Sequence, residues 1–213
     1  MGETAAVSSQ EIVLVRHGET EWSRDGRHTG KTDLPLTDEG RRQAELVGGW
    51  LEGRAFDRVL TSPLSRALET CELAGLGERA DRRDELVEWD YGDYEGLTTP
   101  QIRERRPGWF LWRDGCPGGE SAADVGGRVD SVIGELREAG DAAVFAHGHV
   151  LRVLTARWVK LDPEAGALFA LATATLSELG WEREIPVMRV WNNRGPLAQT
   201  AAVPPRRSQR DPR

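Results

Sequence analysis

The sequence is poor in the features that mark secreted or membrane-spanning proteins. It has only two cysteines, Cys71 and Cys116, which form no CxxC pair, so we expect reduced thiols rather than a disulfide framework. Its longest apolar runs, such as 12–15 and 142–146, are far too short to cross a bilayer. Residues 1–10 hold no apolar segment typical of a secretory signal. We therefore expect a cytoplasmic protein without membrane contact.

Positive charge is also scarce. Lys and Arg number 28 against 35 Asp and Glu, and the formal net charge is −7. Such a balance disfavours nucleic acid as a partner, because nucleic-acid-binding domains present a basic footprint. Residues 204–213 contain four Arg and one Asp, so the rest of the chain is more acidic still. An acidic protein can bind an anion only where positive groups gather locally.

The length of 213 residues suits one domain with a proper hydrophobic core. We find no internal repeat. Residues 1–10 and 196–213, the latter rich in Pro, Arg and Ser, are expected to be disordered tails. This leaves 11–195 as a single domain.

Strand patterns alternate with helix patterns along the body of the chain. This alternation predicts an α/β fold of three layers, with a mostly parallel sheet between helices and a C-terminal edge hairpin. The expected strands are 12–15, 58–61, 85–89, 142–146, 175–181 and 187–191. The expected helices are 37–52, 63–74, one that starts at Thr99 as its N-cap, 121–138 with Ser121 as its N-cap, and 150–160.

Polar residues follow the first four of these strands. Arg16 and His17 follow the first strand, Arg66 the second, Glu88 the third and His147 the fourth. Ligands of parallel sheets bind outside the carboxyl ends of the strands, so these side chains should meet at one rim. Guanidinium groups match phosphate oxygens, and a helix beginning after His147 would add N–H donors for an anion. The sequence therefore predicts a phosphate site.

Several motifs occur together in a recognisable order. On them the chain resembles the histidine phosphatase superfamily, which includes the phosphoglycerate mutases, over about residues 11–192. It is most similar to acid phosphatase and sugar bisphosphatase members, and the resemblance implies the phosphoglycerate mutase-like fold. The motifs are Arg16–Thr20 (RHGET), Leu34–Thr37, Thr61–Ala67, Glu88–Gly96, Pro117–Ser121 and Ala146–His149.

The resemblance implies roles for five residues. His17 would be the nucleophile that takes the phosphoryl group on a ring nitrogen, and Glu88 the proton donor to the leaving oxygen. Arg16, Arg66 and His147 would hold the phosphate oxygens. Fixed Arg and His donors can stabilise the transferred phosphoryl as metals do elsewhere, so we expect neither a metal nor another cofactor.

Further residues would line the substrate side. Thr29 and Gly30 match a loop that touches the substrate phosphate in the mutases, and Gly148 is expected beside the phosphate. Ser23 stands where many relatives carry Asn, so its contact with the phosphate should be weaker or water-mediated. We interpret Glu19 as a partner of one of the Arg side chains.

Glu88 must be protonated to act as an acid. An unperturbed Glu has a pKa of about 4.3, and burial beside Trp89 and Tyr91 would raise that value. We therefore expect an optimum at acid to neutral pH.

The remaining polar residues have plainer interpretations. We expect His149 to be solvated or to cap a helix, His28 to be a loop residue and Arg152 to be a charge on a helix face. Cys116 should be inert. A second anionic group on the substrate would be held by Arg113 or Arg103.

The segment between Glu88 and His147 is shorter than in the cofactor-dependent mutases, which need a substantial lid to exclude water. This favours a phosphomonoester hydrolase that acts on small phosphorylated metabolites through a phosphohistidine. The alternatives are a sedoheptulose-bisphosphatase-like sugar bisphosphatase, a phosphoglycerate mutase, or a non-catalytic binding protein on the same fold. The edge hairpin could pair two copies in a homodimer.

Overall fold

The computed structural model describes residues 10–195. Of the tails expected at 1–10 and 196–213, residues 1–9 and 196–213 lie outside the described residues. Gln10, expected to belong to the N-terminal tail, is buried, and its side-chain oxygen accepts a hydrogen bond from the Trp181 indole N–H at 2.8 Å. The folded part of the chain therefore includes Gln10.

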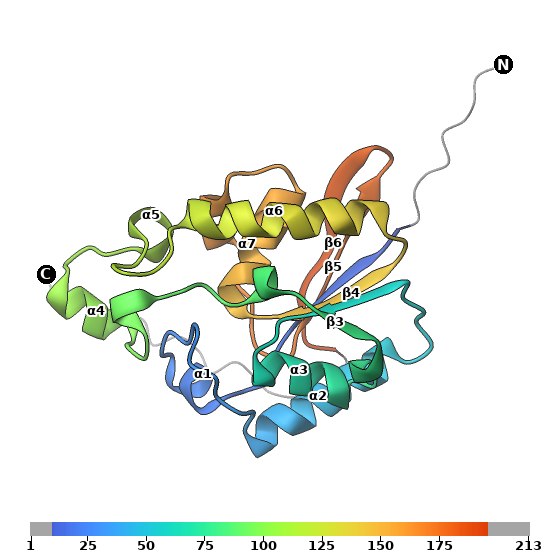
Figure 1. Ribbon diagram of the computed structural model, residues 1–213, viewed down its shortest axis with the longest axis horizontal. Coiled ribbons are helices and arrows are strands. Elements are labelled where there is room, and N and C mark those ends of the chain that lie inside the picture. Colours follow the sequence, from blue (N-terminus) through green and yellow to red (C-terminus); the bar gives the residue numbers. More distant parts are fainter. Residues whose placement is uncertain (1–9, 196–213) are drawn as a thin grey trace, which may run out of the picture.

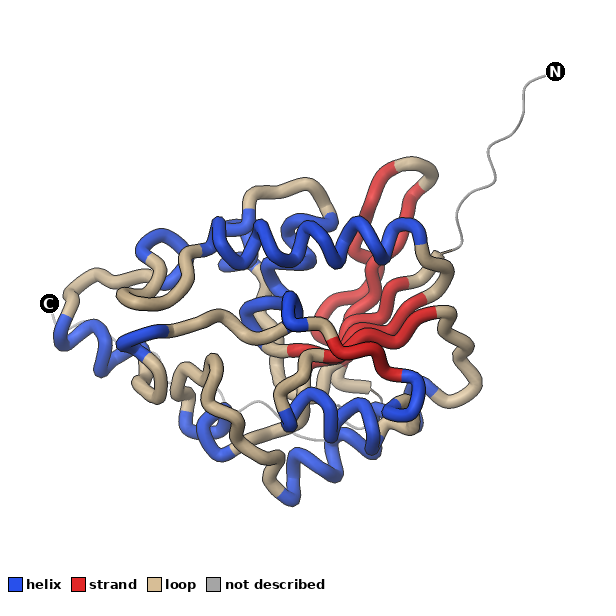
Figure 2. Tube along the Cα trace, in the orientation of Figure 1, coloured by secondary structure: helices blue, strands red, loops and turns tan. Residues whose placement is uncertain are grey.

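Within residues 10–195, six strands form one sheet in the order β3-β2-β4-β1-β5-β6. Figure 2 shows them side by side as a twisted red layer. The first four in this order run parallel, β5 is antiparallel to β1, and β6 is antiparallel to β5. The predicted edge hairpin is thus confirmed. The strands are β1 (Ile12–Arg16), β2 (Arg58–Thr61), β3 (Ala80–Arg82), β4 (Ala142–Ala146), β5 (Leu176–Glu182) and β6 (Ile185–Asn193).

Helices cover both faces of the sheet, which confirms the predicted three-layer α/β fold. In Figure 1, α6 and α7 lie on one side of the strands and α2 and α3 on the other. No helix within residues 10–195 is long and apolar enough to span a membrane. The helices are α1 (Glu21–Asp25), α2 (Asp38–Leu51), α3 (Ser65–Leu73), α4 (Thr99–Arg105), α5 (Leu111–Asp114), α6 (Ala122–Glu138) and α7 (Gly148–Trp158). Short 3-10 turns are η1 (Gly77–Arg79), η2 (Asp84–Leu86), η3 (Gly92–Tyr94) and η4 (Pro163–Leu168).

The central strand β1 is buried on both faces. Ile12 and Leu14 pack in the core cluster that contains the apolar side chains of α6 and α7. Val13 and Val15 belong to the opposite cluster, with residues of α2 and α3. Successive side chains of a strand point to opposite faces, so a continuous apolar run suits this central position. The core thereby fixes the end of β1, where the polar motif begins.

The third strand is not where the sequence placed it. The expected strand 85–89 is wrong, because its first residues form the 3-10 turn η2 and buried Leu86 packs under α6. The third strand is β3, a three-residue edge strand that exposes Asp81 and Arg82. Such a strand has no apolar pattern to reveal it. Glu88 therefore lies in a loop and not at the end of a strand.

Helix starts differ in detail. Pro63 was expected in the first turn of its helix, but α3 begins at Ser65. The N-cap of α4 is Thr98 and not Thr99, because Thr98 forms a capping box with the third helical residue. Ser121 caps α6 as predicted.

Candidate active site

His17 lies immediately after β1 and is buried. Its Nδ1 is 2.7 Å from the carbonyl oxygen of Gly18, which can only accept, so Nδ1 carries the proton and Nε2 keeps its lone pair. Burial, followed by the positive charges of Arg66 and Arg16, holds the pKa of His17 well below its usual value. The result is a neutral imidazole with a basic Nε2, the form that a nucleophilic His needs.

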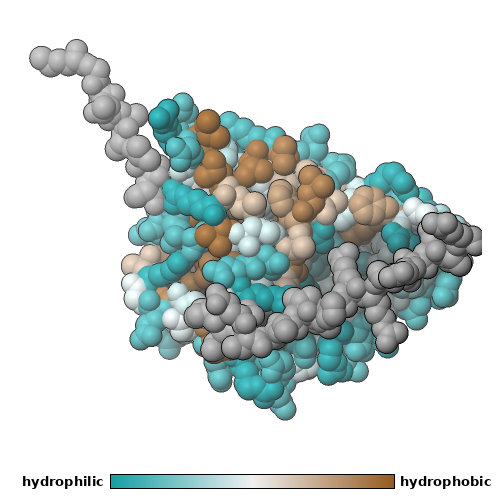
Figure 3. Space-filling model, turned by 180° about the vertical axis from the view of Figure 1, so that it is seen from behind, coloured by the Kyte–Doolittle hydropathy of each residue, from teal (hydrophilic) through white to brown (hydrophobic). Residues whose placement is uncertain are grey.

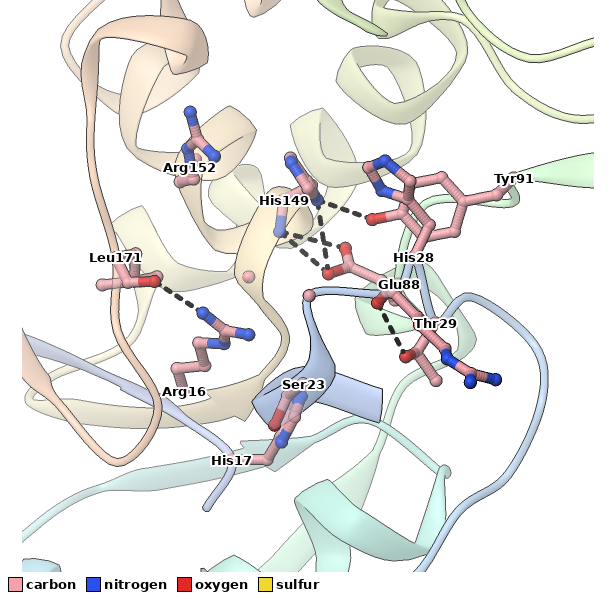
Figure 4. Close-up of a pocket in the computed structure, with 13 residues that line it drawn as sticks. Arg16, His17, Ser23, His28, Thr29, Glu88, Tyr91, His149, Arg152 and Leu171 are labelled. Atoms are coloured by element: carbon pink, nitrogen blue, oxygen red, sulfur yellow. Dashed lines mark hydrogen bonds and ion pairs between the residues drawn. The ribbon is translucent and has the colours of Figure 1, made fainter. Parts of the chain in front are cut away.

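Arg16 and His17 both line a cavity of about 180 Å³, whose wall is drawn in Figure 4. One guanidinium nitrogen of Arg16, Nη1, donates to the Leu171 carbonyl at 2.6 Å. Its Nε is buried and has no hydrogen-bond partner within residues 10–195. A Cβ on Gly148 would lie 3.2 Å from Arg16 Cζ, so glycine leaves room for the guanidinium. A buried cationic donor without a partner is ready for an anion.

Arg66 and His147 are fully buried behind the lining of this cavity. Arg66 Nε donates to His147 Nδ1 at 3.1 Å, and its Nη atoms donate to the Gly30 and Thr32 carbonyls, each at 2.9 Å. His147 Nε2 then donates to the Ser62 hydroxyl at 2.7 Å. The His17 and His147 rings are 5.2 Å apart, so the predicted residues do come together. The polar atoms of Arg66 and His147, however, bind other parts of the chain.

The carboxylate of Glu88 lies at the start of α7. It accepts the backbone N–H groups of His149 and Val150 at 2.9 Å, and that of Trp89 at 2.9 Å. Three backbone N–H groups thus converge on this one carboxylate. The sequence predicts that the N–H groups at the start of α7 bind the phosphate. In the structure, the N–H groups of His149 and Val150 bind the Glu88 carboxylate instead.

The far wall of the cavity contains residues that the sequence interpreted as solvent-facing. His149 and Arg152 both line the cavity, so their interpretation as a solvated residue and a helix-face charge is wrong. The Tyr91 hydroxyl is 2.6 Å from His149 Nδ1, and the His28 and Tyr91 rings are 4.7 Å apart. Arg152 Cζ stands 4.5 Å over the Trp112 ring. Figure 4 shows Arg152 and Arg16 on one side of the cavity, with Tyr91 and His28 on the other.

The His side chains of this wall are neutral. Burial, with the nearby Arg152 charge, holds the pKa of His149 well below its usual value, and burial lowers the pKa of His28 to about 4. Burial also raises the pKa of Tyr91 well above its usual value. Tyr91 therefore donates its O–H to His149 Nδ1, and His149 carries its proton on Nε2.

A comparison with known proteins agrees with this geometry. The family model of the histidine phosphatase superfamily (branch 1) matches residues 12–194. The chain belongs to this superfamily. It is similar to an acid phosphatase of Mycobacterium tuberculosis, with 44% identity over 90% of this chain and 98% of that protein. It is also similar to a sedoheptulose 1,7-bisphosphatase of Saccharomyces cerevisiae, with 38% identity over 70% of this chain and 67% of that protein.

A solved structure extends the likeness to three dimensions. The protein encoded by an open reading frame of Mycobacterium tuberculosis superposes on this chain with a TM-score of 0.82 at 45% sequence identity. The match covers 87% of this chain and 98% of the other. The fold of the superfamily, with its six-stranded sheet and flanking helices, is therefore that of this protein.

Other predicted substrate contacts are partly engaged elsewhere. Ser23 and Thr29 line the cavity, but the Ser23 hydroxyl donates to the Thr20 carbonyl at 3.0 Å and caps α1. Gly30 does not line it. Its N–H donates to the Glu95 carboxylate at 2.8 Å. The backbone carbonyl groups of Thr29 and Gly30 instead accept hydrogen bonds from Arg66.

Three minor predictions are wrong. The Glu19 carboxylate accepts from the Thr37 hydroxyl at 2.9 Å and pairs with no Arg within residues 10–195. Arg113 is exposed and forks onto neighbouring Asp114, at 2.7 Å for the closer pair. Arg103 donates to a backbone carbonyl at 3.0 Å. Neither Arg lines the cavity, whereas Arg152 does. Helical spacing could have identified Arg152 as a cavity residue, because His149 and Arg152 are three residues apart on α7 and share one face.

Cys71 and Cys116 are free and buried, and burial raises the pKa of each thiol to about 12, which keeps them protonated. Within residues 10–195, no group of three or more His, Cys, Asp or Glu side chains could hold a metal ion.

Proposed function

We propose that the protein is a phosphomonoester hydrolase that acts on small phosphorylated metabolites through a phosphohistidine on His17. One observation carries the proposal. The neutral His17, with a free Nε2, shares a cavity with Arg16, whose buried Nε has no partner within residues 10–195. A nucleophile thus stands beside an unused cationic donor for a phosphate oxygen. The name of the mycobacterial relative, acid phosphatase, supports the same chemistry.

The first step forms a bond from His17 Nε2 to phosphorus and breaks the bond from phosphorus to the ester oxygen. Arg16 Nε–H binds an equatorial oxygen, and the buried charge of Arg66 adds to the positive field there. Glu88 gives its proton to the leaving oxygen. That proton arrives with the monoanion of the ester, because the second pKa of a phosphate is about 6. This supports an optimum at acid to neutral pH.

The second step returns the enzyme to its starting state. The Glu88 carboxylate takes a proton from water, the water oxygen attacks phosphorus, and the bond to His17 Nε2 breaks. Inorganic phosphate leaves, and Glu88 passes its proton on to the solvent or to the next leaving group. The roles of Glu88, His147, Thr29 and Gly148 are part of the same proposal.

The test follows the fate of 3-phosphoglycerate by ³¹P NMR, together with the turnover of p-nitrophenyl phosphate. A hydrolase releases inorganic phosphate, and His17→Ala abolishes the release. Accumulation of 2-phosphoglycerate would establish a mutase instead. A wild-type protein without turnover of any phosphate ester would support a non-catalytic binding protein.

Arg152 favours a second candidate, a sugar bisphosphatase. Its guanidinium lines the far wall and packs over Trp112, where it could hold a second phosphate in place of Arg113. Neutral His149 and His28 beside it suit the hydroxyl groups of a sugar. The yeast relative is named a sedoheptulose 1,7-bisphosphatase. If this candidate is right, Arg152→Met raises the KM of a sugar bisphosphate far more than that of the monophosphate.

We also propose that two copies pair through β6. This nine-residue strand ends the sheet and exposes Ile185 and Met188, at 58% and 36% of their surfaces. Unpaired edge strands readily pair with another chain. Figure 3 shows hydrophobic residues gathered on the face opposite to the view of Figure 1. Sedimentation should give a dimer that Ile185→Lys dissociates; a monomeric wild type would contradict the pairing.

A cytoplasmic location completes the proposal. It is supported by the free thiols of Cys71 and Cys116, which suit a reducing compartment. Cell fractionation tests it, and recovery of the protein outside the cytoplasm would contradict it.

A further inference from the structure

A guanidinium from α6 reaches the loop that carries Glu88. Arg128 Nη2 donates to the backbone carbonyl of Glu88 at 3.2 Å, and Nη1 donates to that of Glu85 at 2.6 Å. The same guanidinium forks onto the Glu120 carboxylate, at 2.8 Å from Nε and 3.1 Å from Nη2. One side chain thus ties α6, the residues before it and the Glu88 loop together.

Glu120 extends this connection to the residues after Glu88. Its carboxylate accepts the N–H of Asp90 at 2.8 Å, and its own N–H donates to the Asp90 carbonyl at 2.9 Å. Its carbonyl accepts the Trp89 indole N–H at 2.9 Å. A Cβ on Gly119 would lie 2.2 Å from the Asp90 oxygen, so the two backbones are in direct contact. The Glu88 loop is therefore held on both sides of Glu88.

This support matters because Glu88 has no place in the sheet. The strand expected at 85–89 does not form, so no ladder of backbone hydrogen bonds fixes the loop. The Glu88 carboxylate is held from the cavity side by the amides of α7, and its main chain is held from the other side by Arg128. Arg128 and Glu120 do not line the catalytic cavity. They line a separate surface pocket that Glu88 also borders.

From this arrangement we infer that Arg128 and Glu120 are positioning residues, which hold Glu88 where it can protonate the leaving oxygen. The inference rests on the proposed function, in which Glu88 is the proton donor. Proton transfer depends on distance and alignment more steeply than phosphate binding does, and a misplacement of about 1 Å can lower a rate about 10²-fold. Loss of the Arg128 fork should therefore affect the reactions that need an acid.

Two substrates separate proton transfer from the remaining chemistry. Ethyl phosphate has a poor leaving group that must be protonated as it departs, whereas p-nitrophenolate leaves readily as the anion. We expect Arg128→Met to lower kcat/KM for ethyl phosphate about 10-fold to 100-fold more than for p-nitrophenyl phosphate. Arg128→Lys keeps the charge but cannot reach all of the acceptors, and it should give a smaller selective loss.

The chain offers a matched control in Arg83, which precedes η2 and pairs with a residue of α6. Arg83 forks onto Glu135 of α6 at 2.9 Å and is similarly half-buried, but it makes no bond to the Glu88 loop after residue 86 within the described part of the chain. Arg83→Met should change the turnover of both substrates by the same factor. Glu120→Gln is the second test variant, because it retains the side-chain volume and weakens the fork. Thermal unfolding checks that each variant is folded.

Glu88→Gln gives the reference for complete loss of the acid. If Glu88→Gln lowers kcat/KM by the same factor for both substrates, the proposed role of Glu88 is wrong, and the inference falls with it. If Glu88→Gln is selective for ethyl phosphate but folded Arg128→Met and Glu120→Gln are not, the role of Glu88 stands and only the positioning role is overturned. The inference is supported if Glu88→Gln, Arg128→Met and Glu120→Gln each lower kcat/KM selectively for ethyl phosphate and Arg83→Met does not.

Discussion

The two ends of the cavity are built differently. At the phosphate end, Arg16 is the last residue of β1, and His17 and His147 directly follow the central strands β1 and β4, whose ladder and core hold them. At the leaving-group end, Glu88 and Tyr91 belong to a loop that only side-chain bonds and backbone contacts fix in place. The strands of the sheet therefore hold His17, whereas hydrogen bonds between loops and helices hold Glu88.

Charge also divides the two ends. Arg16 and the buried Arg66 surround His17, and their positive charges lower its pKa. The opposite wall combines neutral His149 and His28, whose pKa values burial lowers, with the charged side chains of Glu88 and Arg152. The phosphate end is therefore suited to an anion, and the neutral His side chains of the other end are suited to uncharged polar groups.

The largest effect is expected at the phosphate end. His17→Ala removes the only nucleophile proposed, so the turnover of p-nitrophenyl phosphate should fall about 10³-fold or more. Rapid-quench experiments with the wild type should trap an acid-labile phosphoenzyme, which the variant lacks. Retention of most of the activity by His17→Ala would break the assignment of this end of the cavity.

Arg66 tests whether the phosphate end is also a structural centre. Arg66→Met leaves the carbonyl groups of Gly30 and Thr32 and the Nδ1 of His147 without their donor. The free energy of unfolding, measured in urea, should fall by about 3 kcal/mol or more. Arg113→Met is the control, and we expect unchanged stability because that side chain is exposed. Equal stability of the two variants would contradict a structural role for Arg66.

The neutral His residues predict how stability depends on pH. The pKa of His28 is about 4 in the folded protein, below the unfolded value of about 6.5, so the unfolded chain binds more protons between these values. The free energy of unfolding should therefore fall as the pH drops from about 6.5 to 4. His28→Gln should show a shallower fall in urea titrations at several pH values. An identical slope would show that His28 does not contribute.

Ser23 should give the smallest effect. Its hydroxyl caps α1 through Thr20, so Ser23→Ala should lower the free energy of unfolding by about 1 kcal/mol. The KM for p-nitrophenyl phosphate should change little, because the hydroxyl is already engaged. A several-fold rise in KM at unchanged kcat would instead restore the predicted contact between Ser23 and the phosphate.

Much of the fold could be predicted from the sequence. The apolar runs that became β1, β2 and β4 are buried on both faces, and a buried parallel strand has a pattern that its residues alone reveal. The three-residue edge strand β3 has no such pattern, and the segment before Glu88 is apolar because η2 buries Leu86. Motif order was sufficient to place His17 and His147 near each other.

Contacts between side chains could not be predicted in the same way. Arg113 and Arg152 are both Arg near the motifs, and only the folded chain shows that one pairs with Asp114 while the other lines the cavity. Arg128 carries no sequence signal at all, because its acceptors are mostly backbone carbonyls and a carboxylate eight residues earlier.

The sequence by itself determined the class of fold and gathered His17 with positive groups at one rim of the sheet. These follow from local periodicity and from the rule that strand ends meet at one rim. Only the tertiary structure decided which carboxylate binds the amides at the start of α7, which nitrogen of His17 is free and which Arg binds the loop of Glu88. Those outcomes depend on how close segments far apart in the sequence come in the folded chain, because a hydrogen bond forms only when its donor and acceptor lie close together.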